Sequence, residues 1–219
     1  MITGRNGFPM SSALTLQSLP LFPLGTVLFP GGVLPLRIFE VRYLDMVSRC
    51  HKAGAPFGVV SLTQGLEVRL PGTSESFAAV GTLASIDAYE TPQPGLMMIR
   101  IRGTQRFRIK SREQLRHGLW IADVERVDPD LAVGIPEDLK GTSEALANLI
   151  QSLQQKATSE DELPIPLPLR LDDSGWVANR WCELLPLPVQ SKQRLMELEN
   201  PLVRLELVND LLNRTGIAT

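Results

Sequence analysis

Residues 19–46 read LPLFPLGTVLFPGGVLPLRIFEVRYLDM, and this stretch decides the fold. It opens with Leu and Phe mixed with Pro, which suits an edge strand or a loop that enters a strand. Residues 29–32 (FPGG) are a turn signal, and Val33–Phe39 follows as a short apolar strand. From Glu40 to His51 the apolar residues recur at helical spacing, and Gly54 is a suitable helix stop. The stretch therefore predicts an extended segment, a turn, a strand and a helix, in that order.

The rest of the chain divides into two parts of different character. Up to residue 130 the sequence predicts more short strands, which suggest a small barrel or sandwich. These strands are expected at Phe57–Thr63, Val80–Ile86, Leu96–Arg102, Arg106–Arg112 and Leu119–Val127. Beyond residue 130 the pattern is helical. Helices are expected around Leu139–Leu153, after a cap at Asp172, Asp173 or Ser174, after a cap at Ser191, and from Asn200-Pro201 to Gly216.

Charge follows the same division. Residues 1–130 carry 14 basic and 11 acidic side chains, whereas residues 131–219 carry 8 and 13, so the net charges are +3 and −5. We therefore expect a leader at residues 1–16, a β-rich subdomain at 17–130 and an α-helical subdomain at 131–219. Met10 is an alternative to Met1 as the first residue of the protein.

Composition excludes several classes of protein. The 219 residues are 43% hydrophobic and 21% charged, which is typical of a globular protein and not of a disordered or coiled-coil chain. No apolar run is long enough for a transmembrane helix, so we expect no membrane partner. Cys50 and Cys182 are too few and too far apart for a disulfide framework, and we interpret both as reduced thiols of a cytoplasmic protein.

The motifs of common enzymes are absent from the sequence. There is no phosphate-binding GxxxxGK[ST], no GxGxxG, no GxSxG and no HExxH. A zinc site made of His and Cys would need all four such residues of the chain. Cys50 and His51 point about 100° apart on a helix, so they do not face each other as a nucleophile and its base. We therefore expect no enzyme, and no catalytic residues, metal or cofactor.

Several segments carry a resemblance to a known family. They are the opening stretch, residues 57–60 (FGVV), 80–82 (VGT) and 103–109 (GTQRFRI), and a C-terminal run within 178–205. Together they resemble the N-terminal (substrate-binding) domain family of Lon protease, over about residues 17–214. That family more often has His where Arg37 stands and Pro where Val41 stands.

The resemblance has implications for fold and function. It implies an α+β fold, with an N-terminal PUA-like β-pseudobarrel followed by a C-terminal helical bundle. The ATPase and Ser-Lys protease modules of a full Lon protease have no counterpart here, so it implies a stand-alone, non-catalytic module that recognises unfolded or extended polypeptide. A separate protease or chaperone is a further expected partner. The oligomeric state is not predicted.

Two sets of residues are candidates for binding. The first set would form an apolar groove for polypeptide, the alternative being an ordinary barrel core; it consists of Arg37, Phe39, Tyr43 and Phe57. Arg37 and Tyr43 each combine apolar area with a polar tip. The second set shares even positions and would form one basic strand face; it consists of Arg100, Arg102, Arg106, Arg108, Lys110 and Arg112.

The basic face predicts a second function. Because side chains alternate along a strand, Ile99, Ile101, Phe107 and Ile109 would face inward while the six cations face outward, unless Gly103-Thr104-Gln105 breaks the alternation. Such a face would bind RNA or an acidic partner. The alternative is a solvated face that pairs with acids such as Asp123 and Glu125 on the next strand. Nucleic acid is thus the second-ranked partner, after polypeptide.

Overall fold

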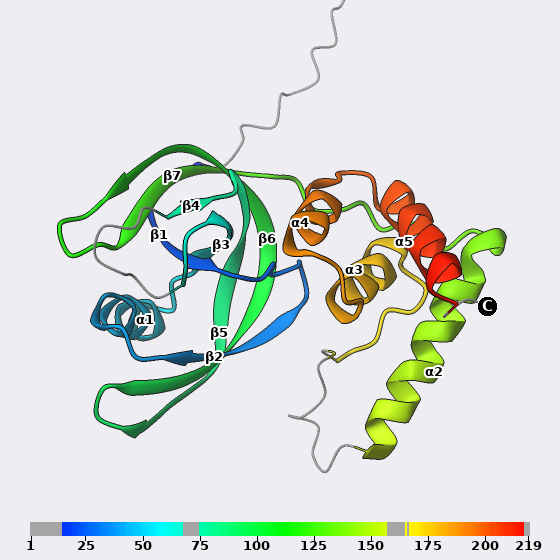
Figure 1. Cartoon of the computed structure of the whole chain (residues 1–219), viewed down its shortest axis with the longest axis horizontal. Coiled ribbons are helices and arrows are strands. Elements are labelled where there is room, and N and C mark those ends of the chain that lie inside the picture. Colours follow the sequence, from blue (N-terminus) through cyan, green and yellow to red (C-terminus); the bar gives the residue numbers. More distant parts are fainter. Residues whose placement is uncertain (1–14, 68–74, 157–164, 166, 217–219) are drawn as a thin grey trace, which may run out of the picture.

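The computed structural model describes residues 15–67, 75–156, 165 and 167–216 (Figure 1). Strands come first and helices second, apart from one early helix, so the expected mixed fold is confirmed. The strands are β1 (Thr15–Leu24), β2 (Val33–Ile38), β3 (Phe57–Gln64), β4 (Ser76–Phe77), β5 (Val80–Gln93), β6 (Leu96–Gln114) and β7 (Trp120–Arg126). The helices are α1 (Val41–Ala53), a 3-10 turn at Glu137–Leu139, α2 (Lys140–Lys156), α3 (Ser174–Leu184), α4 (Val189–Glu197) and α5 (Pro201–Thr215).

The strands form one sheet that closes on itself. The order is β1-β7-β6-β5-β3-β4, and β1 also pairs in parallel with β3. β2 lies off this path and pairs only with β6 among the described strands. The closure leaves β2 as an additional strand beside the first half of β6, where β7 no longer runs.

The predicted helix ends are largely confirmed. Asp173 caps α3 by accepting a hydrogen bond from the Trp176 N–H at 3.0 Å, and Asn200 caps α5 by accepting one from the Leu202 N–H at 2.9 Å. Gly54 ends α1 in the left-handed conformation, with φ of 59°. The prediction for Ser191 is wrong: α4 begins earlier, at Val189, because Pro188 already supplies the extended residue that precedes the helix.

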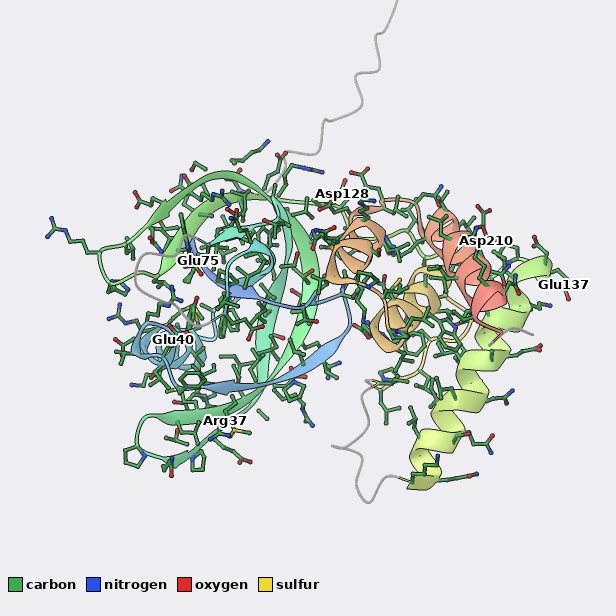
Figure 2. The ribbon with its side chains drawn as sticks, in the orientation of Figure 1. Arg37, Glu40, Glu75, Asp128, Glu137 and Asp210 are labelled. Atoms are coloured by element: carbon green, nitrogen blue, oxygen red, sulfur yellow. The ribbon has the colours of Figure 1, made fainter. Side chains whose placement is uncertain are left out.

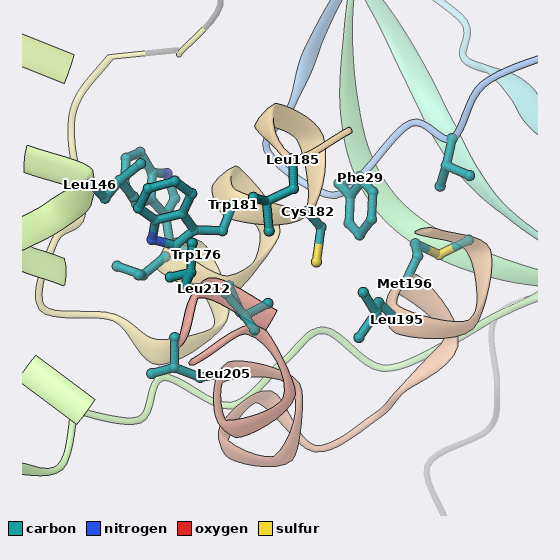
Figure 3. Packing of buried hydrophobic residues seen from close by; sticks show 14 of the residues in the cluster. Phe29, Leu146, Trp176, Trp181, Cys182, Leu185, Leu195, Met196, Leu205 and Leu212 are labelled. Atoms are coloured by element: carbon teal, nitrogen blue, oxygen red, sulfur yellow. The ribbon is translucent and has the colours of Figure 1, made fainter. Parts of the chain in front are cut away.

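The strands and helices pack around separate apolar clusters. Two clusters lie within the sheet, and one of them is covered by α1 through Tyr43, Met46 and Val47. The third cluster joins α2, α3, α4 and α5. Phe29 comes from the turn before β2 and is fully buried in this third cluster, where its ring lies near Cys182, Leu195 and Met196 (Figure 3). The β-rich and helical parts are therefore packed against each other through this turn.

A buried ionic network also joins the two parts. The Asp130 carboxylate accepts hydrogen bonds from the Arg106 Nη2 of β6 at 2.8 Å and from the Arg204 Nη1 of α5 at 2.5 Å. Arg106 donates further to the backbone oxygens of Met196 and Leu198, at 3.0 and 2.8 Å. The expectation that Arg106 faces outward is therefore wrong, since its side chain is only 3% exposed.

The division of the chain at residue 130 remains a prediction. Most of the proposed leader, residues 1–14, lies outside the described residues, while Thr15 and Leu16 belong to β1. Among the described helices, none is long and apolar enough to cross a membrane.

Candidate functional site

The turn before β2 sets the hydrogen-bonding pattern of that strand. Gly31 has a φ of 75°, its N–H donates to the Gly103 oxygen at 2.8 Å, and the Gly103 N–H donates to the Gly32 oxygen at 2.9 Å. This is a β-bulge in which two residues oppose one, and it needs glycine at the position of positive φ. Gly32 and Gly103 are thus a hydrogen-bonded pair, and the pattern continues along β2 with Leu34 opposite Ile101.

One edge of β2 is consequently open. The alternate residues Val33, Pro35 and Arg37 direct their backbone groups away from β6. Pro35 supports this assignment, because proline has no N–H and is tolerated only where no ladder bond is required. No other strand in the described part of the chain pairs with this edge.

A groove of about 310 Å³ lies beside the β2 edge. We call it the β2 groove. Its walls come from the end of β1, from β2 itself, from the start of α1 and from the segment after β3. They are lined by Phe22, Leu24, Pro35, Leu36, Arg37, Ile38, Phe39, Glu40, Tyr43 and Glu67. Figure 2 labels Arg37 on β2 and Glu40 just before α1 on the same side of the β-rich part.

The floor of the β2 groove is aromatic with one polar atom. The Tyr43 ring is only 2% exposed and stacks on Phe22 with their centroids 4.1 Å apart. The Tyr43 hydroxyl is buried and has no hydrogen-bond partner among the residues that the structure describes. Burial raises the pKa of Tyr43, so this hydroxyl keeps its proton and can both donate and accept. A buried polar atom without a partner is rare, and it points to a ligand group in the groove.

Exposed apolar side chains lie at the β2 groove and beside it. Phe39 is 54% exposed, and Val41 beside it is more exposed still. Met98 is also exposed and lies opposite Arg37 in the β2–β6 register. Large exposed apolar side chains that gather in one place are typical of binding surfaces. The arrangement can hold an apolar segment.

The structure brings together three of the four predicted groove residues. Arg37, Phe39 and Tyr43 all line the β2 groove. Phe57 does not, and the prediction that it contacts a polypeptide is corrected: it is fully buried, with its ring centroid 6.2 Å from that of Phe22. Phe57 therefore packs beneath the floor of the β2 groove and does not line it. Sequence reasoning missed Glu67, because nothing local places the segment after β3 next to β2.

The predicted basic face is interrupted. β6 is one continuous strand, but its pairing with β5 shifts between Thr82 and Ala84, opposite Gly103–Arg106, so the alternation breaks there. Arg106 is buried as described above, whereas Arg108 is exposed. Other members have partners: Arg102 pairs with Asp87 at 2.8 Å, Lys110 with Glu125, and Arg112 lies 4.4 Å over the Phe77 ring. Arg100 lies opposite Pro35, on the half of β6 that pairs with β2.

A second, larger cleft of about 750 Å³ lies where the β-rich and helical parts meet. We call it the junction cleft. Its lining includes Arg108 and Arg126, the N-terminal residues Pro201 and Leu202 of α5, and Leu131, which is 78% exposed. The sequence did not predict this cleft, because its walls come from segments that the fold alone brings together.

The residues considered for catalysis are not arranged for it. Cys50 is buried, and the ring of its neighbour His51 stacks on Tyr89 at 4.4 Å. Burial raises the pKa of the Cys50 thiol, which disfavours a thiolate nucleophile. Among the residues that the structure describes, no three His, Cys, Asp or Glu side chains group as a metal site would require.

Comparisons with known proteins agree on one family. The family model described as the ATP-dependent protease La (LON) substrate-binding domain matches residues 18–214. Lon protease 2 of Herpetosiphon aurantiacus is 30% identical over 205 residues, a match that covers 90% of this chain and 24% of that protein. Lon protease 2 of Myxococcus xanthus is 27% identical, again with 24% of its length covered. The chain thus spans about a quarter of these curated relatives.

Solved structures show the same similarity. A Lon N-terminal domain protein from Xanthomonas campestris is 32% identical, with a TM-score of 0.65, and the match covers 88% of this chain and 97% of that one. The N-terminal domain of a Mycobacterium avium complex Lon protease shares the fold at 19% identity, with a TM-score of 0.55.

Proposed function

Because this chain belongs to the Lon protease substrate-binding domain family, we propose that it is a non-catalytic module that binds unfolded or extended polypeptide in the β2 groove. The observation that carries the proposal is the convergence of an open strand edge, exposed apolar residues and the partnerless Tyr43 hydroxyl. An extended polypeptide can supply partners for each of these features. Its backbone offers hydrogen-bond donors and acceptors, and its apolar side chains can cover the exposed apolar residues.

The proposal includes the finer assignments that the family suggests. These are a PUA-like pseudobarrel followed by a helical bundle, a boundary near residue 130, and a separate protease or chaperone that receives the bound chain. A cytoplasmic location is supported by two free, buried cysteines, since reduced thiols persist in reducing compartments.

RNA binding has less support than polypeptide binding. RNA backbones are held by several cations on one face. In the predicted set, Arg106 is saturated by Asp130 and two carbonyls, and Arg102 and Lys110 have carboxylate partners. Labelled RNA is therefore the comparison ligand in the experiment below.

The experiment is fluorescence anisotropy of a labelled, permanently unfolded polypeptide titrated with the protein. We expect saturable binding with a dissociation constant of tens of micromolar or below. Phe39→Ser should weaken binding about tenfold, because an exposed apolar anchor of the β2 groove is lost. Leu131→Ser is the matched control: it also removes an exposed apolar side chain, but from the junction cleft.

The outcomes separate the possible sites. Equal affinity of wild-type protein and Phe39→Ser would contradict the assignment to the β2 groove. A loss confined to Leu131→Ser would move the site to the junction cleft. Salt-sensitive binding to RNA, with none to polypeptide, would overturn the proposed function.

A further inference from the structure

The open edge of β2 has a defined set of unused backbone groups. Val33 and Arg37 each present an N–H and a carbonyl, while Pro35 between them presents only a carbonyl. The two N–H groups are separated by four residues, or about 13 Å along an extended strand. A short polypeptide strand laid along β2 would satisfy these groups by the same pairing that β6 makes on the other side.

The two faces of β2 differ in chemistry. Leu34, Leu36 and Ile38 pack toward the apolar cluster beneath the sheet. An added strand would share this alternation, so every second side chain would point to the floor formed by Phe22 and Tyr43. Those side chains must be apolar.

The opposite face is positively charged near the edge. Arg37 is exposed and lies opposite Met98 of β6. On β6, Arg102 and Arg100 lie opposite Val33 and Pro35 and therefore share this face. Two acidic residues, Asp87, which pairs with Arg102, and Glu90, are on β5, two strands from the open edge. The acidic residues of the β2 groove itself are Glu40, which pairs with Arg42, and Glu67, which accepts a hydrogen bond from the Gly25 N–H. The side chains of an added strand that lie on this face would therefore be acidic, since opposite charges on neighbouring strands stabilise a sheet.

We propose that the β2 groove binds its polypeptide as an added strand, and that its preferred substrates are proline-free extended segments that alternate apolar and acidic residues. This inference rests on the proposed function and names the substrate class of the same groove. The apolar residues enter the β2 groove, the acidic residues face Arg37 and its neighbours, and the backbone pairs with Val33 and Arg37.

The test compares two substitutions at one residue. Arg37→Ala and Arg37→Pro both remove the guanidinium, but only proline also removes the N–H at the open edge. This N–H makes no bond to β6, so the Arg37→Pro variant should fold. Pro35 already occupies an equivalent position in the same strand. The probe is a fluorescein-labelled nine-residue peptide of alternating valine and glutamate. A matched peptide carries lysine in place of glutamate.

We expect wild-type protein to bind the glutamate peptide more tightly than the lysine peptide, and Arg37→Ala to reduce this preference. Arg37→Pro should bind the glutamate peptide at least about fivefold more weakly than Arg37→Ala, because one backbone hydrogen bond is lost. Equal affinity of the two variants, or no preference between the peptides, would overturn the inference.

A second measurement keeps the test independent of variant folding. Glutamate peptides N-methylated on either alternate set of residues are titrated against wild-type protein. Strand addition predicts that one set abolishes binding and the other is tolerated, whereas recognition through side chains alone predicts similar effects. If the unfolded polypeptide binds but both tests fail, only this inference is overturned. If no polypeptide binds at all, the proposed function fails as well.

Discussion

Arg106 and Arg108 are two residues apart on β6 and have opposite environments. Sequence alternation alone places them on one face, and the notion of a basic strand face depends on that. The pairing of β6 with β5 is regular from Arg106 to Arg108, so the two do share a face, but the helical part covers that face only at Arg106, whose guanidinium binds Asp130 and the Met196 carbonyl, and leaves Arg108 exposed. Nothing in the local sequence distinguishes the two arginines, because the partner carboxylate, Asp130, lies 24 residues away.

Substitutions at these two residues measure how much the buried network at the junction contributes to the free energy of unfolding. We predict that Arg106→Met lowers the free energy of unfolding by about 3 kcal/mol, because it removes the side-chain donor of the Met196 carbonyl and one of the two arginines that pair with the buried Asp130 carboxylate. Arg108→Met should change it by no more than about 0.5 kcal/mol, since Arg108 is exposed. Urea denaturation measures both. Similar losses for the two variants would show that Arg106 is not part of a buried network.

The elements themselves were largely predictable from sequence. Hydrophobic spacing indicated the helices, and the residue types at Asp173, Asn200 and Gly54 indicated their ends. Strands β3 and β7 lie close to their expected positions, whereas β5 is expected to end at Ile86 and continues to Gln93. β6 was predicted as two strands because glycine normally interrupts a strand. The structure instead uses Gly103 inside the strand, where the turn before β2 approaches too closely for any side chain.

The close approach at Gly103 can be tested by a single methyl group. A Cβ at Gly103 would lie 2.2 Å from the backbone oxygen of Phe29, which cannot move without displacing the buried turn. We predict that Gly103→Ala lowers the free energy of unfolding by about 2 kcal/mol or more. Gly134→Ala is the control, because a Cβ there meets no atom within 4 Å. Thermal unfolding by circular dichroism compares them, and a stable Gly103→Ala would contradict the bulge geometry.

The candidate groove was only partly visible in the sequence. Exposed and buried aromatic residues look alike in a sequence, so Phe39 and Phe57 were grouped together although only the first is exposed. The open edge of β2 was not predicted, because it follows from which strands fail to pair. Pro35 and the Gly31-Gly32 bulge are the local sequence features that indicate it. They show which edge of β2 is open only once β6 is known to be the partner strand.

At the scale of the whole molecule, Asp130 joins the β-rich and helical parts. It accepts hydrogen bonds from Arg106 of one part and Arg204 of the other. Each part also contains one buried cysteine, Cys50 within α1 and Cys182 within α3. Burial raises the pKa of Cys182 from 9.0 to about 12, so at pH 8 its reactive thiolate is almost absent until the helical part opens. The reactivity of each thiol therefore reports the unfolding of the part of the chain that contains it.

We predict that both thiols of the wild-type protein become reactive toward Ellman's reagent at the same urea concentration. Asp130→Asn leaves two buried guanidinium groups without a counter-charge, and the two thiols should then react at different urea concentrations. Asp128→Asn, at an exposed neighbouring position, should behave as wild type. Mass spectrometry of labelled peptides identifies each thiol. Coincident transitions in Asp130→Asn would show that the apolar contacts of Phe29 suffice to couple the parts.

The central claim is that polypeptide is bound in the β2 groove, and hydrogen exchange of the complex tests it most directly. Mass spectrometry would follow amide exchange with and without a permanently unfolded polypeptide. We predict slower exchange in a fragment that contains residues 33–43, because the open edge and the start of α1 become covered, and no change across the residues 127–133 of the junction cleft. Protection confined to residues 127–133, or protection nowhere despite saturable binding, would contradict the claim.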